Sequence, residues 1–169
     1  MLPKNIVDNA TIVSTINVTG TGTISDVDIS LGGTHTFVND LTITLISPSN
    51  TRVVLFASEC AADVEDFSIT LDDEAGNVIS CPIDDNMLER PRNPLSAFDG
   101  ESMTGNWSVE INDNADGDVG QFSGCSLLIC TGGNAAGPCD PNLNLNGALT
   151  EGVYRAQQNI VSNGTVANG

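Results

Sequence analysis

A β-hairpin between residues 40 and 56 is the feature of this sequence that most limits its possible folds. The run from Asp40 to Ser47 reads D-L-T-I-T-L-I-S, in which every second residue is apolar. Such alternation places one set of side chains on one face of an extended strand: Leu41, Ile43 and Leu45. A P-S-N turn follows, and the apolar run from Thr51 to Phe56 returns. The pattern predicts two antiparallel strands with one buried face.

Comparable runs recur along the first 130 residues, with turn residues between them. Further strands are predicted at 11–18, 23–31, 67–71, 107–111 and 122–130. Aromatic residues make up only 4% of the chain, so the core must be built from Val, Ile and Leu, and β-branched residues fit a pleated sheet. The runs of good helix formers are short and lack apolar residues at helical spacing. We therefore predict an all-β domain.

The chain changes character after Cys130. Residues 131–150 are small, polar and rich in Gly, Pro and Asn, as expected for a linker. We expect residues 1–130 to form one β-sandwich and 151–169 to begin a truncated C-terminal module. Met1 is interpreted as a start residue placed on an excised domain, so the full protein is expected to be larger. No apolar stretch is long enough for a membrane span.

The charge balance is strongly acidic, with 22 acidic and 5 basic residues and a formal net charge of −17. Nucleic acids and anionic membranes are excluded as partners, because both are bound by clustered Lys and Arg. Divalent cations are natural counterions for so many carboxylates. The alternative is that the acidic residues serve only solubility outside the cell.

The five cysteines indicate an oxidising compartment and therefore a secreted protein. No C-x-x-C pair exists and His35 is the single histidine, so a zinc site is not predicted. Cys125 and Cys130 share one predicted strand, about 16 Å apart, which is too far for a disulfide. We favour a Cys60–Cys81 bridge first and Cys130–Cys139 second, which leaves Cys125 as a buried small hydrophobe.

The sequence predicts neither a catalytic centre nor an organic cofactor. A serine-protease triad needs a histidine base, and His35 lies in an apparent strand, T-H-T-F-V. We interpret it as a structural histidine bonded to a backbone group or a carboxylate. No G-x-S-x-G elbow or phosphate-binding loop occurs. Paired carboxylates would suit a glycosidase, but one Trp and one Tyr offer few platforms for a sugar.

Two groups of acidic residues are candidates for calcium. The segment N-x-N-x-D-G-D at 112–118 mimics half of an EF-hand loop, although Ser123 stands where a bidentate Glu is needed. Its candidate ligands are Asp113, Asp116 and Asp118, and a plain type I turn is the alternative. The second group comprises Asp63, Glu65, Asp66, Asp72 and Asp73, with Asp40 able to reach the same ion. A hard cation would relieve their repulsion; the alternative is an exposed acidic loop without an ion.

Two segments together resemble a known family. They are DVDISLGGTHTFVNDLTITLISPSNTRVVLF (26–56) and PLSAFDGESMTGNWSVEINDNADGDVGQFSGCSLLIC (94–130), and FSITLDDEA at 67–75 is similar to its bacterial branch. The pattern resembles the P domain, or Homo B domain, of subtilisin-like proprotein convertases and related bacterial secreted proteases, over roughly residues 5–130. Asn50, Phe122 and Cys125 depart from it, replacing a Gly, a Leu and a Trp.

This resemblance implies an antiparallel jelly-roll or galactose-binding-like β-sandwich. It also implies a secreted, monomeric, non-catalytic domain that stabilises the catalytic domain of its parent serine protease. Calcium on acidic loops would be expected first at Asp40, Asp72 and Asp73, and then at Asp113, Asp116 and Asp118. The competing interpretation is a carbohydrate- or surface-adhesion module, against which the scarcity of aromatic residues weighs.

Overall fold

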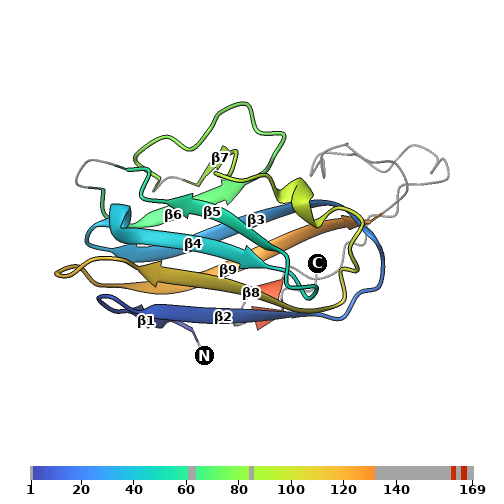
Figure 1. The fold of residues 1–169 in the computed structure, drawn as a ribbon, viewed down its shortest axis with the longest axis horizontal. Helices are drawn as coiled ribbons and strands as arrows, with labels where there is room; N and C mark the ends of the chain where they lie inside the picture. Colours follow the sequence, from blue (N-terminus) through green and yellow to red (C-terminus); the bar gives the residue numbers. More distant parts are fainter. Residues whose placement is uncertain (1, 61–63, 84–85, 132–160, 163–164, 167–169) are drawn as a thin grey trace.

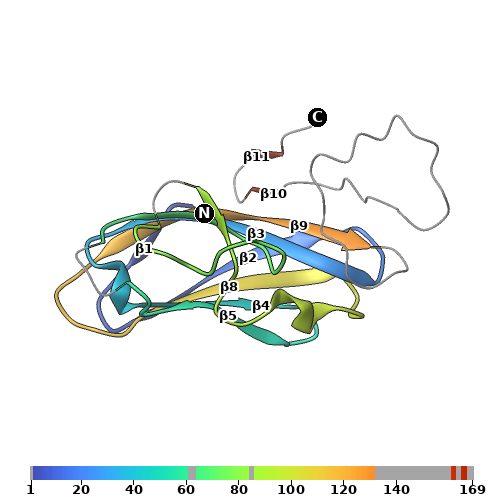
Figure 2. The ribbon, with the colours of Figure 1, turned by 90° about the horizontal axis from the view of Figure 1, so that it is seen from above.

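Two β-sheets packed face to face form the body of the molecule (Figure 1, Figure 2). The computed structural model describes residues 2–60, 64–83, 86–131, 161–162 and 165–166. The five-stranded sheet has the order β1 (Lys4–Ile6), β9 (Gly120–Thr131), β3 (Ile24–His35), β6 (Phe67–Leu71) and β7 (Met87–Glu89). The four-stranded sheet has the order β2 (Thr11–Val18), β8 (Gly105–Asp113), β4 (Leu41–Ile46) and β5 (Arg52–Ala57).

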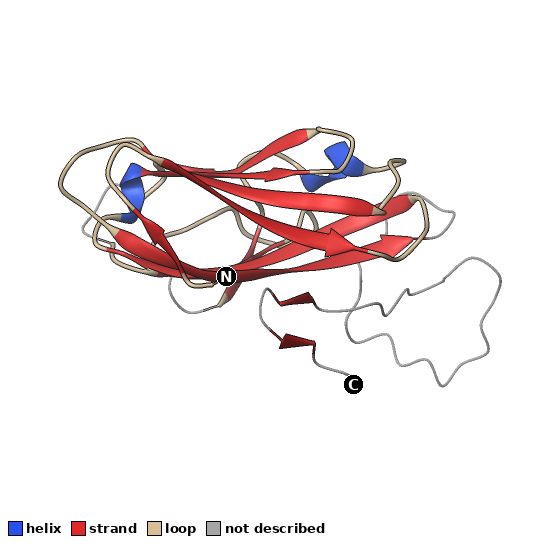
Figure 3. Cartoon of the chain, turned by 90° about the horizontal axis from the view of Figure 1, so that it is seen from below, coloured by secondary structure: helices blue, strands red, loops and turns tan. Residues whose placement is uncertain are grey.

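The remaining elements are short. Two 3-10 helices, η1 (Val38–Asp40) and η2 (Leu95–Phe98), lie at opposite ends of the sandwich (Figure 3). A separate strand pair joins β10 (Val161–Ser162) to β11 (Thr165–Val166). In the part of the chain that the structure describes, no helix is long and apolar enough to cross a membrane. The predicted all-β sandwich is confirmed, while the jelly-roll topology stays a prediction.

The predicted hairpin is β4 and β5, which pair antiparallel from Thr42↔Ala57 to Ile46↔Arg52. Asn50 adopts a left-handed conformation (φ 66°), and its amide donates to the Ser47 carbonyl at 2.9 Å. Asparagine tolerates this conformation better than most residues. The turn therefore closes as the sequence predicts, without the glycine of the family pattern.

The core lies between the sheets and is mainly aliphatic, with a few buried aromatic rings. The inward-facing residues predicted from alternation are all buried: Val27, Ile29, Leu31, Leu41, Ile43, Leu45, Trp107, Val109 and Ile111. Trp107 packs edge-on against Phe98 of η2, with ring centroids 5.0 Å apart, and its Nε1 donates to the Met103 carbonyl at 3.0 Å. This contact fixes η2 to one end of the core.

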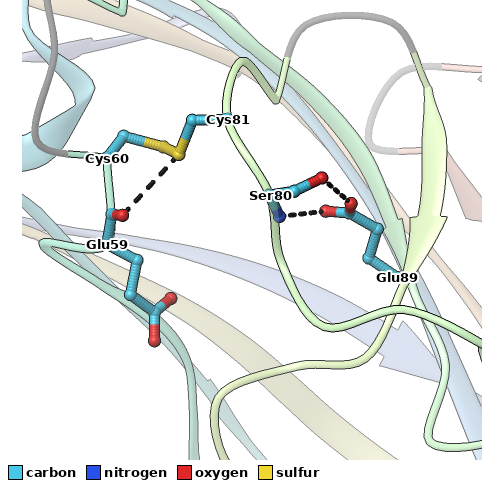
Figure 4. Close-up of a disulfide and its surroundings, with 5 residues drawn as sticks. All are labelled: Glu59, Cys60, Ser80, Cys81 and Glu89. Atoms are coloured by element: carbon cyan, nitrogen blue, oxygen red, sulfur yellow. Dashed lines mark hydrogen bonds between the residues drawn. A yellow bond between two sulfur atoms is a disulfide. The ribbon is translucent and has the colours of Figure 1, made fainter.

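The favoured disulfide, Cys60–Cys81, is present, with 5.7 Å between the two Cα atoms (Figure 4). It joins the segment after β5 to the segment before β7. Near this disulfide, the buried Glu89 carboxylate accepts two hydrogen bonds from Ser80, one from the backbone amide at 3.0 Å and one from the side-chain hydroxyl at 2.5 Å (Figure 4). The same region contains a short strand, β7, that pairs parallel with β6.

The remaining cysteines agree with the prediction as far as the structure describes them. Cys125 is a free thiol, and burial raises its pKa to about 12. Cys130 is in a disulfide. The predicted Cys130–Cys139 pairing involves a residue outside the described part of the chain, as do the predicted linker at 131–150 and most of 151–169.

Candidate metal centre

Acidic residues gather at both ends of β3, the strand that runs the length of the five-stranded sheet. We define the end cluster as His35 with Asp40, Asp66, Asp113, Asp116 and Asp118. We define the start cluster as Asp26, Asp28, Asp72, Asp73, Glu74 and Asp99. Asp28 and His35 are seven residues apart on one strand, which corresponds to about 23 Å. The clusters are therefore separate sites, near η1 and η2 respectively.

The end cluster is built around a buried His–Asp pair. His35 and Asp113 are each 1% exposed, and Nε2 of His35 lies 3.2 Å from Oδ2 of Asp113. The other ring nitrogen, Nδ1, lies 2.8 Å from the Phe37 carbonyl oxygen. The prediction of a structural histidine bonded to backbone and carboxylate is confirmed.

Protein donors also hold the other carboxylates of the end cluster. The Thr36 hydroxyl donates to Asp118 at 2.7 Å, and the Asn9 amide donates to Asp116. The backbone amide of His35 donates to Asp66 at 3.3 Å. The half EF-hand segment therefore folds as a turn whose acids bond to other parts of the chain.

Asp40 joins this end rather than the residues after β6. Its carbonyl accepts from the backbone and side-chain amides of Asn114, each at 2.9 Å. Burial raises the pKa of the Asp40 carboxyl, and repulsion from Asp113 and Asp118 raises it further. The structure therefore brings Asp40, Asp113 and Asp118 into one neighbourhood.

The start cluster arises from the register of β3 against β6. Ile29 pairs with Leu71 and Ser30 with Thr70, whose hydroxyls lie 2.8 Å apart. One step further, the same register sets Asp28 opposite Asp72. Because residues two apart on a strand share a face, Asp26 and Asp28 both point away from the core side that Val27 and Ile29 occupy.

A third segment completes the start cluster where β6 ends. The Ile24 amide donates to the Glu101 carbonyl at 2.8 Å, and the Gly100 amide donates to the Ile24 carbonyl at 2.9 Å. These bonds bring Asp99 beside the start of β3. Asp73 anchors the same segment, since its two oxygens accept from the amides of Leu95 and Ser96 at 2.8 Å each.

Asp28 is the acid of the start cluster that has a buried carboxylate oxygen without a hydrogen-bond partner among the described residues. The residue is 9% exposed, and its Oδ1 has no hydrogen-bond partner among the described residues. Burial raises the pKa of its carboxyl to about 8, helped by repulsion from Asp26, Asp72, Glu74 and Asp73. Native proteins rarely bury a carboxylate without a donor or a counter-charge.

The pKa values of two other acids in the start cluster are also raised. Burial, followed by a hydrogen bond with Asp72, raises the pKa of Glu74 to about 7. Burial, followed by repulsion from Asp26 and Asp73, also raises the pKa of Asp99. All three shifts mark a place where negative charge accumulates without compensation.

The sequence-predicted ligands are thus divided between the two clusters. Asp66 and Asp72 flank β6 and stand about 20 Å apart along the chain; Asp63 lies outside the described residues. Sequence reasoning missed Asp26, Asp28, Glu74 and Asp99. The available signal was the D-V-D alternation, which puts two acids on one face of a strand. Across the described ranges, no three acidic, histidine or cysteine side chains already surround a common point as metal ligands.

Comparison with protein-family models identifies one family. The family described as "Proprotein convertase P-domain" matches residues 24–129. Two crystal structures of a serine protease of Aeromonas sobria are similar, one of them in complex with a chaperone. Their identities are 24% for the complex and 26% for the protease, with TM-scores of 0.43 and 0.42; each match covers 73% of this chain. The chain spans 19% of those proteins' length, and no curated protein matches it.

Proposed function

The chain belongs to the proprotein convertase P-domain family, and on that premise we propose that it is the non-catalytic, calcium-binding accessory domain of a secreted subtilisin-like serine protease. The observation that carries this proposal is the family match, which runs from the start of β3 to the end of β9 and so covers most of the sandwich. The domain stabilises the catalytic domain of its parent, which is its expected partner.

A supporting role rather than a catalytic one fits the position of the single histidine. His35 is fully enclosed, and both ring nitrogens face groups of this chain, the Asp113 carboxylate and the Phe37 backbone. A general base must reach the proton that it removes from a substrate or nucleophile. His35 serves the packing of β3 against β8 instead.

Calcium fits the chemistry of the acids. The chain carries a net charge of −17, and the buried Oδ1 of Asp28 lacks a donor among the described residues. Calcium takes six to eight oxygen ligands and would supply the missing positive charge. An ion present at 100 times its dissociation constant stabilises the folded state by about 2.7 kcal/mol. The proposed contribution of the domain to its parent is therefore stability that depends on calcium.

Secretion fits the disulfides, which persist in oxidising compartments. We propose further that the domain acts as a monomer outside the cell. Residues 131–150 are proposed as a linker and 151–169 as the start of another module, both based on composition alone.

Two measurements test the proposal. Reading the gene around this segment should reveal a subtilisin-like catalytic domain upstream. Deleting residues 1–130 from that protease should lower its yield of folded enzyme and speed its thermal inactivation. If the gene encodes no protease domain and the chain binds sugars on a glycan array, the adhesion alternative would be supported instead.

A further inference from the structure

We propose that the start cluster binds one calcium ion, with Asp28 as its buried ligand and with Asp26, Asp72, Glu74 and Asp99 supplying the other carboxylate oxygens. This assignment rests on the calcium binding proposed for the domain and gives that ion a location. It differs from the sequence expectation, which placed Asp72 with Asp66 and Asp40 and did not include Asp26, Asp28, Glu74 or Asp99.

The first argument is the unpartnered oxygen of Asp28. Buried Oε2 of Glu59 also lacks a hydrogen-bond partner among the described residues, but Oε1 of the same residue pairs with Nη1 of Arg92 at 2.9 Å. Asp28 has no such relief within the described ranges, because every charged group there that acts on it is an acid. A bound cation would satisfy this oxygen and remove the repulsion together.

The second argument is that three chain segments meet at the start of β3, the part of the strand that carries Asp26 and Asp28. They are the start of β3, the turn after β6 and the segment after η2. The first and third are joined by the backbone bonds between Ile24 and residues 100–101. The second and third are joined by Asp73, whose carboxylate holds the first amides of η2. Asp73 is thus a positioning residue, with its oxygens already engaged.

The third argument concerns the choice of ion. Every candidate donor is a carboxylate oxygen, the ligand type that calcium prefers, whereas zinc favours histidine and cysteine. His35 lies at the other end of β3, and Cys130, which pairs with Asp26 across the sheet, is held in a disulfide. Glu74 and Asp99 are exposed, so they can rotate toward an ion that tolerates variable geometry. Magnesium demands a stricter octahedron.

The end cluster is the weaker candidate because no acid described there keeps a buried oxygen without a partner. At the start cluster Asp26 and Asp72 also accept from backbone amides, but Oδ1 of Asp28 has no partner among the described residues. His35 faces Asp113, Thr36 donates to Asp118, and Asn9 donates to Asp116. A cation entering there would have to break these bonds first. This difference supplies the control for the experiment.

The experiment is calorimetric titration of the metal-stripped chain with calcium chloride, with melting curves recorded in calcium and in EGTA. The variants are Asp28→Asn, Glu74→Gln and the double control D116N/D118N. The wild type should bind one ion and melt higher in calcium. Asp28→Asn should weaken calcium binding by about 100-fold or more. Substituting residues that only hydrogen-bond to metal ligands already lowers metal affinity about 10–100-fold. The double control should bind like the wild type.

The outcomes separate this assignment from the broader proposal. A wild type that binds no calcium removes the calcium part of the proposed function. A wild type that binds calcium, with Asp28→Asn and Glu74→Gln unaffected and the double control impaired, leaves that function standing and overturns this site. Glu74 is exposed, so Glu74→Gln folds as the wild type does and gives an answer even if Asp28→Asn does not. Glu74→Gln should weaken binding about tenfold.

Discussion

The two ends of β3 carry similar numbers of acidic residues but treat them differently. At the end cluster, His35, Thr36, Asn9 and a backbone amide bond to four of the five acids, and no buried carboxylate oxygen described there lacks a partner. At the start cluster Asp28 keeps a buried oxygen without any donor among the described residues. Acidic composition is therefore a poor guide to a cation site, and the supply of local donors is a better one.

We expect the largest effect on stability from removing His35, the side chain that faces Asp113 in the end cluster. His35→Phe keeps the ring volume but leaves the Asp113 carboxylate buried without its main partner. We expect the free energy of unfolding to fall by roughly 3–5 kcal/mol, as for one-sided removal of a buried pair. Urea denaturation measures this. The double variant His35→Phe/Asp113→Leu should recover part of the loss, and a single variant as stable as the wild type would show that the pair is dispensable.

The next effect concerns calcium and the start cluster. Calcium at about 100 times its dissociation constant should stabilise the wild-type chain by about 2.7 kcal/mol, which corresponds to a rise in Tm of about 10 °C. Differential scanning calorimetry in calcium and in EGTA measures the shift. His35→Phe, although destabilised, should show the same calcium response, since it alters only the far end of β3. A response lost in that variant would mean that the two ends are coupled.

A smaller effect of opposite sign is expected without calcium. Because the pKa of Asp28 is raised to about 8, the folded chain near pH 7 must either protonate this carboxyl or bury its charge without a donor. Asp28→Asn removes that cost, so it should stabilise the chain in EGTA by about 1–2 kcal/mol. Asp118→Asn makes the same chemical change where Thr36 already donates, and it should give no gain. Equal effects of both substitutions in urea denaturation would contradict the contrast between the clusters.

The smallest effect tests the scaffold of the start cluster. Asp73→Ala removes the acceptor of two amides at the start of η2 and should cost about 1 kcal/mol, the usual value of such a cap. Asp66 has a left-handed backbone (φ 59°), which Asn tolerates and Ala does not, so the comparison variant is Asp66→Asn. It weakens only the 3.3 Å bond from the His35 amide and should cost less. Thermal denaturation in EGTA ranks the two variants, and the reverse ranking would argue against Asp73 as the anchor of η2.

Local patterns predicted the features that depend on neighbouring residues. The alternation in 40–47 with the turn at Asn50 specified β4 and β5. The position of His35 in the predicted strand T-H-T-F-V indicated a structural role. The Cys60–Cys81 bridge followed from the exclusion of pairing within one strand. Each of these predictions is confirmed by the structure.

The composition of the start cluster could not be predicted in the same way. Asp66 and Asp72 are close in sequence, but the extended strand between them carries them to opposite ends of the sheet. Asp99 reaches Asp26 only because the segment after η2 pairs with Ile24 beyond the end of β6. The parallel pairing of β7 with β6 depends on contacts of the same kind. Such arrangements are fixed by the packing of distant segments, which no local pattern records.

The Cys60–Cys81 bridge has a consequence for the accessory role proposed above. It encloses β6 and the turn that carries Asp72 and Glu74 within one covalent ring. Cleavage of a single peptide bond inside that ring opens it but releases no fragment. The nicked strand stays hydrogen-bonded between β3 and β7, so the sheet can survive an accidental cut by a peptidase.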